Sequence, residues 1–162
     1  MTRAGVLLVF LALVAATRSA HGSPGGSGYI GWPGNETWVL AGGNAGLVIG
    51  HGDTSWLLGA EASIVHIGDE GGWYGGYADI VDDANHEGAR VSLGGEIGIG
   101  LVGLDLGPVI DLGGDLVSIR FRGVVTSGAV SLYFGPVIPV AGSADHDSWS
   151  ELGILVKLPR RL

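Results

Sequence analysis

The stretch Arg90–Leu101 has the sequence RVSLGGEIGIGL, in which apolar side chains alternate with charged residues, serine and glycine. The same alternation recurs over Val117–Arg122, which is VSIRFR. Successive side chains of a β-strand point to opposite faces of its sheet, so a period of two predicts strands with one apolar and one polar face. A soluble barrel buries the apolar face, whereas a membrane barrel turns that face toward lipid.

The same pattern, interrupted by turn residues, predicts an all-β chain of eight strands. These are expected at Glu36–Gly50, Thr54–Ile67, Trp73–Val81, Ala89–Gly100, Val102–Leu112, Val117–Val125, Ala129–Gly135 and Ser148–Leu158. Most have a length that crosses a bilayer when the strand is tilted. Eight consecutive strands with short connections predict an antiparallel up-and-down transmembrane β-barrel, whose interior is just wide enough for side chains.

The N-terminus predicts a cleaved secretory signal peptide over residues 1–22. Arg3 precedes the apolar run Ala4–Ala16, and Ala20-His21-Gly22 supplies small residues before a cut after Gly22. Cleavage after Ser19 is a second option, and an uncleaved anchor or a buried helix are the alternatives to a signal. Residues 23–35, rich in Gly, Pro and Ser, are expected to form a flexible lead-in. The barrel domain then covers residues 36–162.

The composition excludes several classes of protein. Only 15% of residues are charged, which is little for a soluble surface, and 32 of 162 residues are glycine. Without residues 1–22, six basic residues remain against sixteen acidic ones, a net charge of −10 that argues against nucleic acid as a partner. No cysteine is present, which excludes disulfides and cysteine-ligated zinc.

The polar faces of the predicted strands carry a nearly balanced set of charges. The set consists of Glu61, Asp79, Arg90, Glu96, Asp105, Arg120, Arg122, Glu151 and Lys157. Glycines share these faces, among them Gly94, Gly98, Gly103, Gly107 and Gly153, and glycine makes room for long side chains in a crowded interior. An Arg turned to lipid at mid-depth costs about 2–4 kcal/mol. The polar face is therefore predicted to be the barrel interior, filled by a structural salt-bridge network; a gated ion path is the alternative.

Aromatic residues fall near the ends of the predicted strands. They are Trp38, Trp56, Trp73, Tyr74, Tyr133 and Trp149. Trp and Tyr at strand ends are typical of the aromatic girdles of membrane barrels. We expect these residues to mark the two membrane interfaces.

Over residues 36–158 the chain resembles the small eight-stranded bacterial outer-membrane barrels of the OmpA/OmpX type. The resemblance lies in the signal peptide, the strand count, the alternation and the inward Glu/Arg set. It implies a monomeric, non-enzymatic protein of the bacterial outer membrane without cofactor, in contact with the lipid bilayer and with the outer-membrane assembly machinery. Its role would be structural, adhesive or in interaction. The chain departs from such barrels at its end, Lys157–Leu162, which lacks the usual terminal aromatic residue.

Two other functions remain open at this stage. The first is a soluble or periplasmic, lipocalin-like barrel that binds a small ligand. The second is an outer-membrane hydrolase, because Asp82-Asp83 and Asp145-His146-Asp147 lie in or near predicted connections at one rim. Paired acids opposite a His–Asp pair can activate water, and clustered carboxylates can hold Ca²⁺, but solvated acidic loops are the simpler interpretation.

Neither the glycines nor the histidines predict a cofactor or metal site. Gly98–Gly103 matches the G-x-G-x-x-G fingerprint of dinucleotide sites, but a strand rather than the required helix is expected to follow. His51, His66, His86 and His146 share no metal-ligand spacing.

Overall fold

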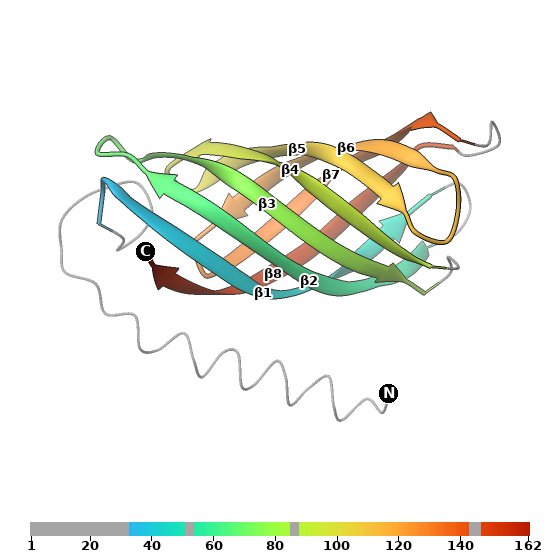
Figure 1. The fold of residues 1–162 in the computed structure, drawn as a ribbon, viewed down its shortest axis with the longest axis horizontal. Coiled ribbons are helices and arrows are strands. Elements are labelled where there is room, and N and C mark those ends of the chain that lie inside the picture. Colours follow the sequence, from blue (N-terminus) through green and yellow to red (C-terminus); the bar gives the residue numbers. More distant parts are fainter. Residues whose placement is uncertain (1–32, 51–53, 85–87, 143–146) are drawn as a thin grey trace, which may run out of the picture.

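The computed structural model describes residues 33–50, 54–84, 88–142 and 147–162, which form a closed antiparallel barrel of eight strands (Figure 1). The strands are β1 (Glu36–Ile49), β2 (Thr54–Ile67), β3 (Gly72–Asp83), β4 (Ala89–Ile99), β5 (Val102–Asp111), β6 (Val117–Thr126), β7 (Val130–Ala141) and β8 (Trp149–Arg161). The all-β, eight-stranded antiparallel fold is thereby confirmed. The predicted signal peptide and most of the lead-in lie outside the described residues. No helix among the described residues is long and apolar enough to cross a membrane.

Each strand pairs with the next along the chain, and β8 pairs back to β1 to close the barrel. The start of β1 and the end of β8 lie at one end, together with the short turns after β2, β4 and β6 (Figure 1). We call this the turn end. The strands β1, β3, β5 and β7 finish at the opposite end, which we call the loop end.

Burial alternates along the strands as the sequence pattern predicts. In β2, for example, Leu57, Glu61 and Val65 are buried, whereas Leu58 and Ile64 between them are exposed. Interior glycines allow close packing: a Cβ atom on Gly98 or Gly103 would overlap the ring of Trp73. The glycine and charged residues therefore share the inner face, and most of the large aliphatic side chains form the outer one.

Four strands extend beyond their predicted ends. β7 continues past Pro136 to Ala141, β8 continues to Arg161, β3 continues to Asp83, and β6 continues by one residue to Thr126. The predicted strands ended just before Pro136 and Pro159, a residue type that cannot donate to the ladder, whereas Pro108 lay inside the predicted strand Val102–Leu112. The ring of Pro136 faces outward. Pro136 also lies where the β6–β7 pairing is interrupted, because the register passes directly from Arg120↔Val137 to Gly123↔Phe134.

A Gly-Pro-Val-Ile motif produces the same interruption twice, at residues 107–110 and 135–138. Beside Pro108 the β4–β5 pairing passes from Ser92↔Val109 to Gly95↔Leu106. In each motif the glycine lets a carbonyl oxygen of the adjacent strand approach closely, that of Leu93 at Gly107 and that of Phe121 at Gly135. The motif thus combines an outward proline with an inward glycine that no larger residue can replace.

We expect Gly135→Ala to prevent the barrel from closing, because the added Cβ atom would overlap the backbone oxygen of Phe121. The matched control is Gly123→Ala, whose Cβ atom would lie 3.6 Å from the Phe134 oxygen, an ordinary contact. Folded barrel measured by circular dichroism after refolding should be largely lost in the first variant and retained in the second. Equal yields from the two variants would contradict this account of the motif.

The interior is layered along the barrel axis. At the turn end Leu40, Val65, Ile67 and Trp73 form an apolar cluster with Trp38 packed against it. At the loop end Val48, Leu57 and Val81 form a second cluster, against which Trp149 packs. The charged residues begin between the two clusters and continue to the loop end, where Asp83 and Arg90 are the register partners of Leu57 and Val81.

Candidate functional site: a buried charge network

The structure places all nine charged residues of the predicted network inside the barrel, each at most 8% exposed. They project from β2, β3, β4, β5, β6 and β8, so the network joins strands from all around the wall. The alternation of the sequence explains this placement. In each strand every second residue points inward, and each of these charged residues occupies one of those positions, which we call the inward parity of the strand.

Arg122 is the centre of the network on its turn-end side. Its Nη1 atom lies 2.9 Å from Glu61 Oε2 and 3.5 Å from Asp79 Oδ2, and its Nη2 atom lies 2.9 Å from Asp105 Oδ2. Glu61 also pairs with Lys157, whose Nζ atom is 2.5 Å from Oε1 and donates to Ser63 Oγ at 3.1 Å. One guanidinium thus pairs with carboxylates from three different strands.

Arg120 and Arg90 continue the network toward the loop end. Arg120 pairs with Asp79 and lies 3.5 Å from Glu151, and it donates to Ser92 Oγ at 2.5 Å. Arg90 lies 3.2 Å from Glu151 Oε1 and 3.4 Å from Asp83 Oδ2. Glu151 therefore bridges two arginines, and the ion pairs run continuously along the interior.

Aromatic rings fill the space between these charges. The guanidinium carbon of Arg122 lies 4.6 Å from the Tyr77 ring centroid and 5.1 Å from that of Tyr133. Arg90 lies 5.3 Å from the Trp149 ring. Cation–π contacts of this kind contribute about 0.5–2 kcal/mol each, more where water is excluded. The rings therefore pack directly against the charged groups of the interior.

Tyr133 adds a hydrogen bond across the barrel, its hydroxyl donating to Asn44 Oδ1 at 2.8 Å. Tyr133→Phe removes this donor and leaves the amide oxygen buried, so we expect a loss of about 1–3 kcal/mol in the free energy of unfolding. Urea titration followed by tryptophan fluorescence measures it. The control is Tyr74→Phe, an exposed residue on the outer face, which should unfold like the unmodified chain. A Tyr133→Phe variant as stable as the unmodified chain would contradict a structural role for this bond.

Two further carboxylates that were not predicted, Asp83 and Asp111, are buried inside the barrel. Asp83 was expected in a connection, but β3 extends to it, and it faces inward to accept from Ser55 and pair with Arg90. Its inward parity with Asp79 was the signal that could have identified it. Asp111 shares parity with Asp105 in the same way. Its Oδ1 atom accepts a hydrogen bond from the Gly113 amide at 2.9 Å.

The prediction that all six aromatic residues form interfacial girdles is wrong for four of them. Trp73 and Tyr133 are buried inside the barrel, and Trp38 and Trp149 pack against the interior clusters. Trp56 near the loop end and Tyr74 near the turn end point outward. Position near a strand end does not determine which face a residue occupies; its parity does.

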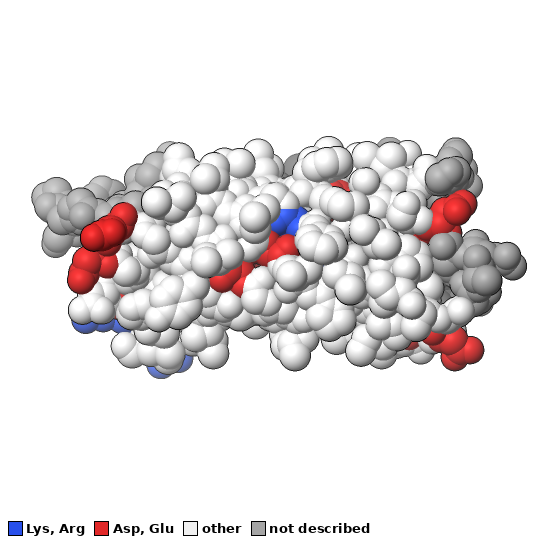
Figure 2. Space-filling model, turned by 90° about the horizontal axis from the view of Figure 1, so that it is seen from above, with Lys and Arg blue, Asp and Glu red and all other residues white. Residues whose placement is uncertain are grey.

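The outer face is almost entirely apolar between the two ends. Figure 2 shows acidic residues gathered at both ends of one face and uncharged atoms over most of its length. Every exposed charged residue that the structure describes lies in a connection or in the last two residues of a strand: Asp69, Glu70, Asp82, Asp115, Asp147, Arg160 and Arg161. The charged atoms visible near the middle of Figure 2 belong to residues that are themselves buried.

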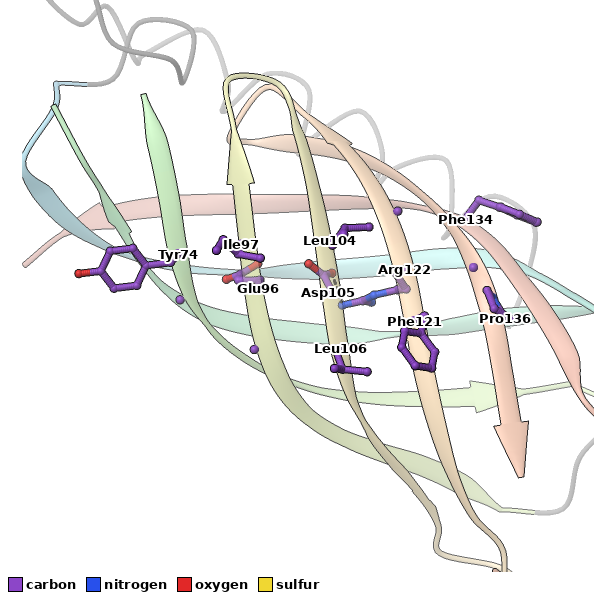
Figure 3. Close-up of a pocket in the computed structure, with 14 residues that line it drawn as sticks. Tyr74, Glu96, Ile97, Leu104, Asp105, Leu106, Phe121, Arg122, Phe134 and Pro136 are labelled. Carbon is purple, nitrogen blue, oxygen red and sulfur yellow. Dashed lines mark ion pairs between the residues drawn. The ribbon is translucent and has the colours of Figure 1, made fainter. Parts of the chain in front are cut away.

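Opposite faces of the same strands differ completely in chemistry. In Figure 3, Arg122 on β6 reaches toward Asp105 on β5, beside Glu96 on β4. A depression of the outer face at these strands is lined by the side chains of Tyr74, Ile97, Leu104, Leu106, Phe121 and Phe134, and also by Glu96, Asp105 and Arg122. Apolar side chains therefore cover most of this face, and the charged side chains lie directly beneath them.

The structure brings together no constellation for the alternative chemistries within the residues it describes. Gly98 and Gly103 are register partners in the β4–β5 hairpin, so strand rather than helix follows the glycine motif. Of the proposed rim acids, Asp83 is buried in the network, and Asp145 and His146 lie outside the described residues.

The histidines are equally uninformative as ligands. His66 lies on β2 with its Nδ1 atom 3.1 Å from the Thr37 hydroxyl, and His51 and His86 lie outside the described residues. No group of three or more His, Cys, Asp or Glu side chains in the described part of the chain is arranged to hold a metal. Comparison with protein-family models, curated proteins and solved structures found no match to this chain.

Proposed function

We propose that the chain is an integral barrel of the bacterial outer membrane, exported by its signal peptide, with a structural or interaction role and a plugged interior. The observation that carries this proposal is which face of the sheet points outward: the charged side chains are buried inside the barrel, and large aliphatic side chains are exposed on every strand. In water, a contiguous exposed apolar surface of this extent drives aggregation, whereas lipid solvates it.

The filled interior supports a role without catalysis or conduction. Ion pairs and aromatic rings occupy the middle layer, and an apolar cluster occupies each end. Function then resides on the outer surfaces, which are the lipid-facing wall and the loop end. The partners we propose are the bilayer itself and the outer-membrane assembly machinery, and the barrel acts as a monomer without cofactor.

Expression of the full chain in a Gram-negative host tests the proposal. We expect the mature protein in the outer-membrane fraction, with a gel mobility that changes on heating in detergent. The matched control lacks residues 1–22 and should accumulate as insoluble or cytoplasmic protein. Recovery of the mature chain as a folded, detergent-free soluble protein would overturn the proposal and favour the soluble ligand-binding alternative.

A further inference from the structure

The carboxylate of Glu96 stands apart from the rest of the buried network. It is 8% exposed, and neither an ion pair nor a hydrogen bond to its Oε1 atom is found among the described residues. Asp105 lies directly opposite Glu96 in the β4–β5 register and is 4% exposed. Its Oδ2 atom pairs with Arg122, but its Oδ1 atom accepts no hydrogen bond within the described chain. Two buried carboxylate oxygens on adjacent strands, Glu96 Oε1 and Asp105 Oδ1, are therefore without a hydrogen-bond donor among the described residues.

Both side chains line a small cavity between the charged layer and Trp73. The cavity has a volume of about 10 Å³, which is room for about one water molecule or one ion of that size. Thr126 and Ser131 line it as well. The Ser131 hydroxyl donates to Thr126 Oγ1 at 2.7 Å, and the Gly128 amide donates to the same oxygen at 3.0 Å, so the lone pairs of Ser131 Oγ are the ones left available. The cavity thus gathers carboxylate and hydroxyl oxygens, the ligand type that hard cations prefer.

The charges of the interior do not balance. Among the residues that the structure describes, seven carboxylates and four cations are buried: Glu61, Asp79, Asp83, Glu96, Asp105, Asp111 and Glu151 against Arg90, Arg120, Arg122 and Lys157. Lys157 also lines the cavity, but its ammonium group is engaged by Glu61 at 2.5 Å and Ser63 at 3.1 Å. A buried carboxylate without compensation is costly, so a further positive charge near Glu96 would stabilise the fold.

We propose that this cavity binds one monovalent cation of the size of Na⁺, with Glu96 and Asp105 as anionic ligands and the hydroxyl of Ser131 as a neutral one. A divalent ion such as Ca²⁺ takes six to eight oxygens, more than the five that these three side chains supply. The ammonium group of Lys157 in the same lining also opposes a second positive charge. The site lies inside the barrel, so it does not depend on whether the outer face meets lipid.

Thermal unfolding of the purified barrel in NaCl and in choline chloride of equal ionic strength tests the site. Choline is too large for the cavity. We expect Na⁺ to raise the unfolding midpoint in a saturable way, by about 4 °C at tenfold excess over its dissociation constant. Glu96→Gln should lose most of this response. Asp82→Asn, which removes one exposed carboxylate near the loop end, should keep it.

A second readout is the broadening of the ²³Na resonance by the unmodified protein, which reports binding without any variant. Identical midpoints in the two salts, with no broadening, would overturn the proposal. A midpoint that follows pH but not Na⁺ would also overturn it, by showing that a proton balances the charge. A Na⁺ response unchanged in Glu96→Gln would place any bound ion elsewhere.

Discussion

Arg122→Met is expected to lower the free energy of unfolding by about 3–5 kcal/mol, the usual cost of removing one partner from a buried ion pair. Arg122 is fully buried and lies within 3.5 Å of carboxylates from Glu61, Asp79 and Asp105. Methionine keeps much of the length of the side chain, so the loss reports charge rather than a cavity. Urea unfolding of the refolded barrel, followed by tryptophan fluorescence, measures the difference.

The matched control is Arg161→Met at the turn end. Arg161 also forms an ion pair, 2.8 Å from Glu36, but its side chain is 64% exposed. Exposed pairs contribute about 0–1 kcal/mol, so this variant should unfold almost like the unmodified chain. Adding Asp105→Asn to Arg122→Met should recover part of the loss, because one uncompensated carboxylate disappears. If Arg122→Met were as stable as Arg161→Met, the network would not hold the barrel together.

The strand pattern could be predicted because it depends on parity alone. Arg90, Glu96, Arg120 and Arg122 share a face with glycines. The period of two therefore predicts that each of them lies inside the barrel, and this holds even where the exact ends of a strand are predicted wrongly. The same rule extends to Asp83 and Asp111. Asp83 was placed beyond the predicted strand Trp73–Val81, and Asp111 lay inside the predicted strand Val102–Leu112 but was not included in the inward set. Strand ends were predictable only where a glycine turn sets them, as at β4–β5.

The pairings within the network could not be predicted from the sequence. Arg122 contacts Glu61 across 61 residues of chain, and that contact depends on how far each strand is staggered against its neighbour when the barrel closes. The end of β7 was predicted too early, just before Pro136, for a related reason. Whether Pro136 breaks β7 depends on whether its missing N–H faces a paired or an interrupted part of the ladder, which is a property of β6 as much as of β7.

Because the large aliphatic side chains face outward, a substitution on the outer face can distinguish a membrane barrel from a soluble one. Leu93 lies in the middle of β4 and is 66% exposed. In lipid, Leu93→Arg should cost about 2–4 kcal/mol, because the charge lies near the bilayer midplane. In water, an exposed leucine can become arginine with a change of about 0.5 kcal/mol or less. Refolding into lipid vesicles, with the folded fraction measured across a urea series, gives the difference.

Leu112→Arg supplies the matched control, since Leu112 is 61% exposed but follows the end of β5 at the loop end. The cost of arginine falls to about 0–1 kcal/mol near the membrane interface, so this variant should refold almost normally. A clear difference between two identical substitutions at similarly exposed leucines has no explanation in a uniform aqueous solvent. It requires a medium whose polarity changes along the barrel axis. Equal stability of the two variants in vesicles would show instead that the apolar face of β4 does not lie in the hydrocarbon layer.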